Sequence, residues 1–548
     1  RYKKEQLLIS FFSLIFIIYI FNLVISINLS FYGNLLTKKK EFVIFFGIIV
    51  SSFISITINL FIPINFIVQI IIISIPFLFI QKIRYYRILY YLKISFWVSL
   101  ISFLIIYQRR YQNDYGLYHL PFIEMINNYK TIIGSTNVNF RFGHSSILSY
   151  FSAIFNFKID NDIKNIILIT SHVYILSFYL FYGLRKILKK KCESFFDQIH
   201  IYTLVFILLH IISLNKVGYD IFPLIFIVIS MAMITKKKIL YVDFLENSLL
   251  VVYSIFLKTS VIFYIFIPII IFLKNIKKFN IKKNLKLVLF IITLCLVAIL
   301  TNFLKSSCLV YPISFSCLDT IWLNKSYGSP ENVFLETSAW SKGWANQSIF
   351  NYQDYVSNFN WVKNYMQTHF IDKIFFKIIL PYTLLISIFL IFKNKIDKKK
   401  YPNSINKNYY MLIFFITTIS IFSWFISSPD IRYGYTQLVI FFSIVTFFFV
   451  LKLNLEIKKI LFYLFFILIF QFFCRFFLYQ YEVISKDLYK SDYFPNIPEI
   501  AIIKKEDLNI PIDNLCWDVK FPCITKESQI DNVNIYQTKH FLIFSSIK

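Results

Sequence analysis

The chain has 548 residues, of which 57% are hydrophobic, and its mean hydropathy is +0.64. A soluble protein of this length would form several domains with apolar cores and polar surfaces, whereas here long apolar runs follow one another along nearly the whole chain. The net charge of +28 does not indicate nucleic-acid binding, because the basic residues stand in short clusters between the apolar runs, as in the loops of membrane proteins.

The apolar runs predict an all-α polytopic membrane protein with about 12–14 transmembrane helices. A bilayer core of ~30 Å requires ~20 apolar helical residues, and we find none of the short alternating segments of a transmembrane β-barrel. The run Ile147–Phe157 is too short to span, and 245–257 with 259–273 is predicted to be one broken helix plus a re-entrant turn. The predicted spans are 7–29, 42–62, 64–80, 92–107, 165–183, 200–214, 220–235, 245–257, 259–273, 286–304, 374–392, 410–427, 435–451 and 458–479.

The basic clusters predict the orientation of these spans. All fall on one side of the membrane, which the positive-inside rule assigns to the cytoplasm; only the N-terminal Arg1–Lys4 contradicts this register. The clusters are Lys38–Lys40, Lys82–Arg87, Arg185–Lys191, Lys236–Lys238, Lys274–Lys286, Lys393–Lys400 and Lys452–Lys459. We therefore expect a transmembrane domain over 1–479, with outer loops 108–164 and 305–373, and an extracytoplasmic C-terminal tail over 480–548.

The first outer loop holds the polar residues with the most chemical promise. Asp114 stands at the predicted membrane boundary, just before an amphipathic segment that we expect to lie in the interface. Its carboxylate could cap a helix or act as a general base. His119 follows five residues later, and Arg141 and His144 add donors suited to a phosphate, with membrane snorkelling as the alternative for Arg141.

Four of the seven cysteines lie on the predicted outer side: Cys308, Cys317, Cys516 and Cys523. Their spacings of nine and seven residues would close small loops, and such pairs oxidise in a bacterial periplasm. Unrelated thiols are the alternative for both pairs. Cys192, Cys295 and Cys474 are interpreted as packing residues, and no spacing indicates a zinc site.

Three further features lie near the same side. Lys258 stands between two short apolar runs and either binds a lipid phosphate or snorkels. Asp430 and Arg432 lie on a short turn, where they pair with each other or Arg432 binds a phosphate. The second outer loop combines acids and amides with several tryptophans, which suit either sugar binding or an interfacial aromatic belt. These residues are Asp319, Trp322, Glu336, Trp340, Trp344, Asn346, Gln347 and Trp361.

Four separated stretches resemble a group of largely uncharacterised bacterial proteins similar to the GT-C superfamily of membrane glycosyltransferases. The first runs from Asp114 through Gly116, Leu117, Tyr118, His119 and Leu120 to Gly134 and Asn139–Gly143, although Ser135, Thr136 and Val138 depart from the pattern. The second combines Tyr311-Pro312 with Cys317 and Trp322. The third runs from Trp424-Phe425 through Pro429 to Arg432-Tyr433, and the fourth from Cys516-Trp517-Asp518 to Pro522-Cys523.

The resemblance implies transfer of a sugar from a polyprenyl-phosphate donor to a lipid-linked or cell-surface glycan acceptor. It implies a multi-pass protein of the bacterial cytoplasmic (inner) membrane whose active face is extracytoplasmic. Asp114 would activate the acceptor, and the substrate-binding residues would be Tyr118, His119, Arg141, His144, Lys258, Asp430 and Arg432. Relatives differ in their need for a divalent metal; with one clear acid in the first loop, we expect no obligatory metal. Expected partners are the donor, the acceptor and membrane lipids, with no nucleic acid.

Other functions remain open at the level of the sequence. A transporter or flippase of lipid-linked glycans would carry several charges deep in its spans, broken helices and internal repeats; here Lys258 and Arg475 are the main charges within apolar runs, and no repeat is visible. A glycan polymerase or ligase would rely on Arg and His in the large outer loop, which contains His369 but no Arg. An inactive scaffold is the fourth alternative.

Overall fold

The computed structural model describes most of the chain. The ranges are 2–79, 85–107, 114–144, 146–157, 161–188, 195–214, 218–234, 239–278, 284–326, 328–344, 351–391, 407–453, 501–505, 508–512, 515–524, 533–537 and 542–546, with single helical residues at 470 and 474. Apart from residues 470 and 474, the predicted span 458–479 lies outside the described residues, as do Asn346 and Gln347.

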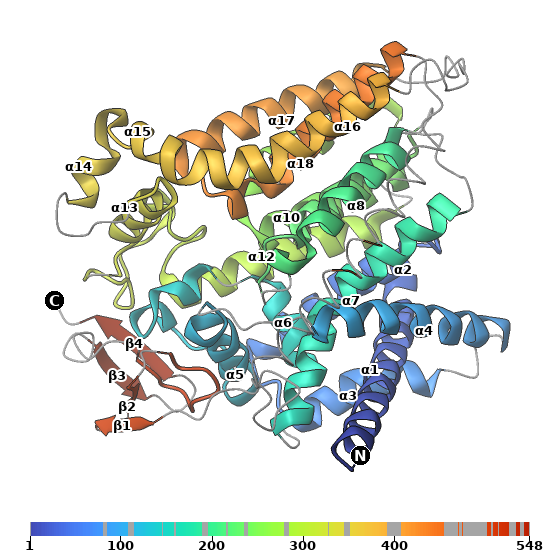
Figure 1. The fold of residues 1–548 in the computed structure, drawn as a ribbon. Coiled ribbons are helices and arrows are strands. Elements are labelled where there is room, and N and C mark those ends of the chain that lie inside the picture. Colours follow the sequence, from blue (N-terminus) through green and yellow to red (C-terminus); the bar gives the residue numbers. More distant parts are fainter. Residues whose placement is uncertain are drawn as a thin grey trace.

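The fold is a bundle of helices with a small strand-containing tail (Figure 1). The helices are α1 (Tyr2–Asn34), α2 (Val43–Asn59), α3 (Phe66–Leu78), α4 (Tyr85–Tyr107), α5 (Leu120–Asn128), α6 (Leu148–Ile154), α7 (Asn161–Leu188), α8 (Phe195–Leu214), α9 (Phe222–Ile234), α10 (Tyr241–Leu257), α11 (Phe266–Asn275), α12 (Leu285–Ser306), α13 (Pro330–Ser341), α14 (Tyr352–Val356), α15 (Val362–Tyr365), α16 (Leu380–Ile391), α17 (Lys407–Ser427) and α18 (Ile431–Leu453).

The helical character predicted from the apolar runs is confirmed. Each predicted span from 7–29 to 435–451 contains a described helix. Five helical segments are long and apolar enough to cross a membrane: Ser13–Asn34, Ile167–Ile187, Leu285–Ser306, Tyr409–Ser427 and Ile431–Phe449. These helices are those of a membrane-associated protein, whereas the total of 12–14 crossings stays a prediction.

The bundle has a buried centre and a periphery of exposed apolar side chains. In α9, every residue except Ala232 is buried, which explains why this helix is apolar on all sides. Polar side chains join helices within the apolar interior: Asn22 of α1 donates to Ser99 of α4 (3.0 Å), and Ser26 of α1 bonds to Tyr174 of α7 (2.8 Å). Such bonds stabilise helix pairs where no water competes for the polar groups.

The predicted break between 245–257 and 259–273 is present. Helix α10 ends at Leu257, Lys258 has extended backbone angles, and a 3₁₀ segment over Thr259–Ile265 leads into α11. The two ends of α10 carry separate ion pairs. At its start Lys39 pairs with Asp243 (2.5 Å) and with Glu246, and Lys258 follows its end, about 25 Å away along a helix of this length.

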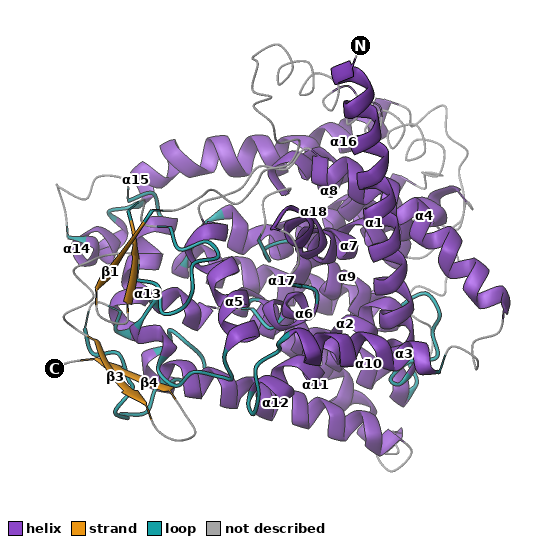
Figure 2. Ribbon diagram, turned by 90° about the horizontal axis from the view of Figure 1, so that it is seen from below, coloured by secondary structure: helices purple, strands orange, loops and turns teal. Residues whose placement is uncertain are grey.

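The tail contains strands, which the predicted all-α class did not include. β1 (Ile502–Lys505) pairs antiparallel with β2 (Leu508–Pro511), and β3 (Val533–Gln537) pairs antiparallel with β4 (Leu542–Ser546). In Figures 1 and 2 these strands and α13–α15 gather at the same end of the molecule. A parallel bridge between Ile133 and Ile543 joins the tail to the segment after α5.

Candidate functional site

Asp114 and Arg432, which are 318 residues apart in the sequence, form an ion pair. The Arg432 Nη1 donates to Asp114 Oδ2 at 2.8 Å. Asp114 precedes a π-helical turn over Tyr115–His119, and Arg432 lies in the first turn of α18. The two side chains are 28% and 40% exposed, so the pair is open to a ligand. We use the term site cluster for Asp114, Tyr118, His119, Asp220, Lys258, Asp430 and Arg432.

The turn between α17 and α18 holds Arg432 in place. Asp430 Oδ1 accepts the backbone N–H of Arg432 at 2.8 Å and lies 3.6 Å from its Nε. Trp424 Nε1 donates to the carbonyl of Asp430 (2.9 Å), and Tyr365 donates its hydroxyl to the carbonyl of Pro429 (2.9 Å). Asp430 therefore contacts and orients Arg432, which is the first of the two alternatives for this turn, and the guanidinium also reaches Asp114. Phosphate binding by Arg432 stays a prediction.

Lys258 enters the site cluster from the break after α10. Its Nζ pairs with Asp220, donates to the carbonyl of Arg432 (3.2 Å) and lies 4.3 Å from the centre of the Tyr433 ring. Burial alone would raise the pKa of Asp220, but Lys258 and Arg432 more than compensate and lower it. Lys258 is thus an ion-pair partner within the folded protein, a role that neither alternative from the sequence included; phosphate binding by Lys258 stays a prediction.

Asp220 was missed by the sequence analysis. It stands at the first position of the predicted span 220–235, where an acid is an ordinary boundary residue between an apolar run and a polar loop. The available signal was the combination of an acid at a span boundary with a lysine at the boundary of the next spans, since both boundaries would lie on the same side of the membrane.

His119 and Tyr118 lie on the π-helical turn that follows Asp114. The His119 ring contacts the Tyr219 ring edge-on, with centroids 4.7 Å apart, and lies 4.1 Å from the Tyr118 ring. Burial lowers the pKa of His119 to about 4, and the nearby acids Asp114 and Asp220 oppose that shift only in part. His119 is therefore neutral at pH 7 and serves in aromatic packing there. π-Helical turns are frequent at functional sites.

The lowered pKa of His119 predicts a loss of stability in acid. An unfolded histidine has a pKa near ~6.5, so between pH 6.5 and 4 the unfolded chain binds the proton first and the free energy of unfolding falls. The full shift corresponds to ~3 kcal/mol, and the partial exposure of the ring reduces this. In thermal unfolding, His119→Phe is expected to lose less stability than the wild type when the pH falls from 7 to 4.5. Between pH 7 and 8 the difference in stability between the two proteins should change little. An equal acid effect in both proteins would contradict the lowered pKa.

Arg141 and His144 lie on a 3₁₀ segment, Phe140–His144, beside the Asp114 turn. Asn139 connects this segment to the Asp114 turn: its side chain donates to the carbonyl of Leu117 (3.2 Å) and accepts from the backbone N–H of Arg141 (3.0 Å). Arg141 lies 4.5 Å from the Phe140 ring, and the His144 ring contacts the Tyr311 ring. Arg141 and His144 thus flank the site cluster, on the segment that Asn139 joins to the Asp114 turn.

The tail contacts the Asp114 turn through a disulfide-closed loop. The structure contains a bond between Cys516 and Cys523, and Trp517, inside that loop, donates its backbone N–H to the carbonyl of Gly116 at 2.7 Å. The indole covers Gly116 so closely that a Cβ there would lie 2.4 Å from a ring carbon. Glycine at this position, two residues after Asp114, is thus required by the approach of Trp517.

The second disulfide joins Cys308 to Cys317 in the segment after α12. Tyr311, within that loop, covers Gly143, where a Cβ would lie 2.3 Å from a ring carbon. All four stretches of the resemblance therefore meet: the Asp114 turn, the Tyr311 loop, the Arg432 turn and the Trp517 loop. We call the surface they form the loop face.

Other acids of the two predicted outer loops lie away from the site cluster. Glu124 is buried and accepts from Asn156 (3.0 Å). Asp319 is 77% exposed and pairs with Lys325 (2.6 Å), and Glu336 accepts from Trp340 (3.4 Å). Within the described residues, no group of three or more His, Cys, Asp or Glu side chains has a metal-binding arrangement. Independence from an obligatory metal stays a prediction.

The fold and the site cluster together define a class: a helical membrane protein with an ion-paired group of charges at one end of its bundle. Residues 7–439 match a family model described as "Domain of unknown function (DUF8201)". Because the match covers more than half of the chain, the protein belongs to this family. No curated protein and no solved structure matches the chain.

Proposed function

We propose that the protein is a GT-C-type glycosyltransferase, which transfers a sugar from a polyprenyl-phosphate donor to a lipid-linked or cell-surface glycan acceptor. The proposal rests chiefly on one observation: a carboxylate, Asp114, forms an ion pair with a partly exposed arginine, Arg432, and Lys258 lies beside them. A carboxylate next to phosphate-binding cations is the minimum that such a transfer requires. The proposal places the loop face on the extracytoplasmic side of the bacterial inner membrane.

In the proposed reaction, the donor phosphate competes with Asp114 for the Arg432 guanidinium. Arginine binds phosphate through two parallel N–H donors, and Lys258 adds a second positive charge. The released Asp114 carboxylate accepts the proton of the acceptor hydroxyl, while the oxygen of that hydroxyl forms a bond to the anomeric carbon of the donor sugar. The bond from that carbon to the phosphate oxygen breaks, and the cations stabilise the negative charge on the departing phosphate.

The flanking groups have supporting roles in this proposal. Arg141 offers a further cation on the side of the Asp114 turn, near His144 and Tyr311. Tyr118 has a pKa raised by burial and then by Asp114, so its hydroxyl stays protonated and can donate to a sugar oxygen. Asp430 keeps Arg432 oriented through its backbone and its Nε.

Loss of the Asp114 carboxylate is expected to lower transfer by about 10²- to 10⁴-fold, the usual contribution of a general base. The measurement is transfer of radiolabelled sugar from a panel of polyprenyl-phosphate donors, in membranes containing wild type or Asp114→Asn at equal protein levels. Asp354→Asn, a change of an exposed acid in α14, is the matched control and should keep full activity.

Equal activity of Asp114→Asn and wild type would exclude Asp114 as the base. If no donor supports transfer, a deletion strain provides the next test. Accumulation of lipid-linked glycan on the cytoplasmic leaflet of that strain would replace the proposal with a flippase.

A further inference from the structure

Helix α12 presents a continuous apolar stripe to its surroundings. Leu289, Ile292, Leu296 and Leu300 follow one another at helical spacing and are 45–61% exposed. This helix has the highest hydropathy of the five that are long enough to cross a membrane, and only 22% of its apolar window is buried inside the protein. The exposed stripe is therefore the side of α12 that faces lipid.

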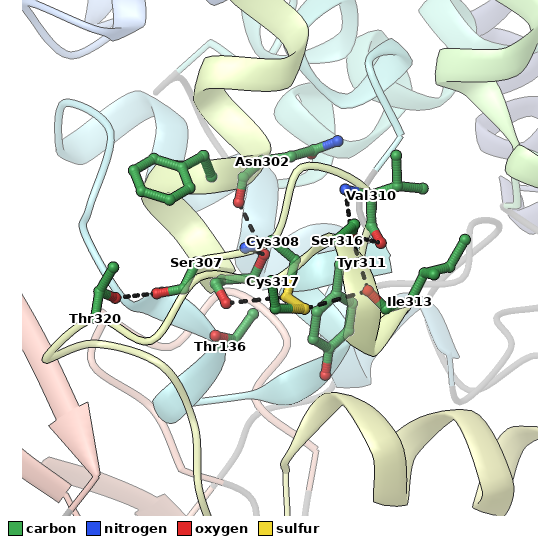
Figure 3. Close-up of a disulfide and its surroundings, with 12 residues drawn as sticks. Thr136, Asn302, Ser307, Cys308, Val310, Tyr311, Ile313, Ser316, Cys317 and Thr320 are labelled. Atoms are coloured by element: carbon green, nitrogen blue, oxygen red, sulfur yellow. Dashed lines mark hydrogen bonds between the residues drawn. A yellow bond between two sulfur atoms is a disulfide. The ribbon is translucent and has the colours of Figure 1, made fainter.

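The segment after α12 cannot move far from the end of the helix. Cys308 is two residues beyond Ser306, the last residue of α12, and is bonded to Cys317. Backbone bonds close the same loop, from Leu318 to the carbonyl of Ser307 (2.8 Å) and from Leu309 to the carbonyl of Ser316 (3.0 Å), and Figure 3 shows how compactly the disulfide region is folded. Phe315 is two residues from Cys317, so it lies within about 7 Å of chain from this closure.

The outer side of this short loop is apolar and uncovered. Phe315 is 91% exposed, Ile321 70%, Leu318 56% and Leu309 44%. Four large apolar side chains exposed within thirteen residues exceed the scattered exposure of an ordinary protein surface. Asp319, the charged residue between Leu309 and Ile321, forms an ion pair with Lys325 just beyond this segment.

We propose that the loop Leu309–Ile321 is a membrane anchor, whose apolar side chains insert into the bilayer at the boundary between acyl chains and headgroups. The loop begins three residues after the end of α12, so its exposed apolar side chains follow the lipid-facing stripe along the chain, and the disulfide keeps them near the depth where α12 ends. Phenylalanine and leucine suit this depth, as in amphipathic segments that lie in the interface.

Through Tyr311, the same loop also contacts another part of the loop face, the segment Arg141–His144. Tyr311 packs on Gly143 and against the His144 ring, with ring centroids of the latter pair 5.2 Å apart. One short, covalently closed segment thus touches lipid on one side and the Arg141–His144 segment on the other. The anchor thereby fixes the height of the site cluster above the bilayer. This inference does not depend on which reaction the site performs.

The test measures the depth of Phe315 in nanodiscs. In full-length protein with Cys192, Cys295 and Cys474 changed to Ser, and with both disulfides kept, Phe315→Cys is labelled with bimane. Leu289→Cys on the lipid-facing stripe and Glu331→Cys, an exposed acid at the start of α13, are the matched controls. Quenching is compared between brominated phosphatidylcholine within the disc and aqueous iodide.

The anchor predicts that the label at 315 is quenched by brominated lipid, as at 289, and several-fold less by iodide than at 331. Quenching at 315 by iodide alone would show a loop in water and overturn the proposal. Protection from both quenchers would also overturn it, since a protein partner or a second copy would then cover the loop. Ile321→Cys repeats the measurement if the variant at 315 does not fold.

Discussion

Replacing Gly116 by alanine is expected to produce a large structural effect on the loop face from a single added methyl group. The new Cβ would lie 2.4 and 2.5 Å from two carbons of the Trp517 indole, a rigid ring that cannot bend aside. Such overpacking costs ~1–3 kcal/mol or more. Movement of Trp517 would also lengthen its hydrogen bond to the carbonyl of Gly116. We expect a lower unfolding temperature and, under the proposed function, reduced transfer, since Gly116 is two residues from Asp114.

A matched glycine and a mutant cycle make this prediction specific. Gly218→Ala should be nearly neutral, because the nearest atom to its added Cβ lies at 3.6 Å, an ordinary contact. If the clash with Trp517 is the cause, Gly116→Ala should cost little more in a Trp517→Ala background than Trp517→Ala alone. An equal cost in both backgrounds would refute the contact between the tail and the Asp114 turn.

Replacing Lys258 by methionine is the second change with a large expected effect. Methionine keeps an unbranched stem but removes the charge that pairs with Asp220, whose side chain is only 29% exposed. Removing one partner of a fully buried pair costs ~3–5 kcal/mol, and the partial exposure here reduces the expected loss to ~1–3 kcal/mol. The double variant Lys258→Met with Asp220→Asn should recover part of this stability, because no unpaired carboxylate remains.

The dependence on pH identifies the cause of this loss. Lys258 and Arg432 lower the pKa of Asp220 against the effect of burial, so the pair contributes stability above the unfolded value of ~3.9, which is lost as the pH falls through the folded value. Without Lys258 the effect of burial is less opposed, so the pKa of Asp220 in the variant lies above its wild-type value. The loss in Lys258→Met should therefore be full near pH 7 and smaller at about pH 3.5, where Asp220 takes up a proton, measured by thermal unfolding in detergent. Lys325→Met, which breaks the exposed pair with Asp319, should be nearly neutral at both.

Activity separates the structural role of Lys258 from a role in binding. Under the proposed function, the double variant regains stability but keeps a raised KM for the donor, because the cation that meets the phosphate is still missing. A double variant with wild-type KM would assign Lys258 to structure alone. That result would leave Arg432 and Arg141 as the donor-binding cations.

The positions of the helices could be predicted from the sequence because each helix is indicated by the hydropathy of its own segment. Apolar runs such as 7–29 and 410–427 predict helices, since an unpaired backbone polar group in lipid is too costly for any other open conformation. The interruption at Lys258 was also readable, because a charged residue between two short apolar runs disfavours one continuous span. The strands of the tail were not, since β1 and β2 carry mixed polar and apolar residues without a clear period.

Part of the site could also be predicted from local features of the sequence. Asp114 and Arg432 stood out because acids and arginines outside the basic clusters are scarce, and the structure brings these two into contact. Nothing local distinguished Asp220 from an ordinary span edge. Its role appears only when the break after α10 places Lys258 against it.

By itself, the sequence determined the class of the protein, the segments that form helices and the residue types able to carry charge chemistry on one side of the bundle. These properties follow from hydropathy and from charge placement, which act along the chain. Only the tertiary structure decided which charges pair, that Trp517 requires glycine at 116, and that the Cys308–Cys317 loop exposes apolar side chains at the end of α12. Such contacts join residues up to several hundred positions apart, and their energies depend on distances that no local pattern encodes.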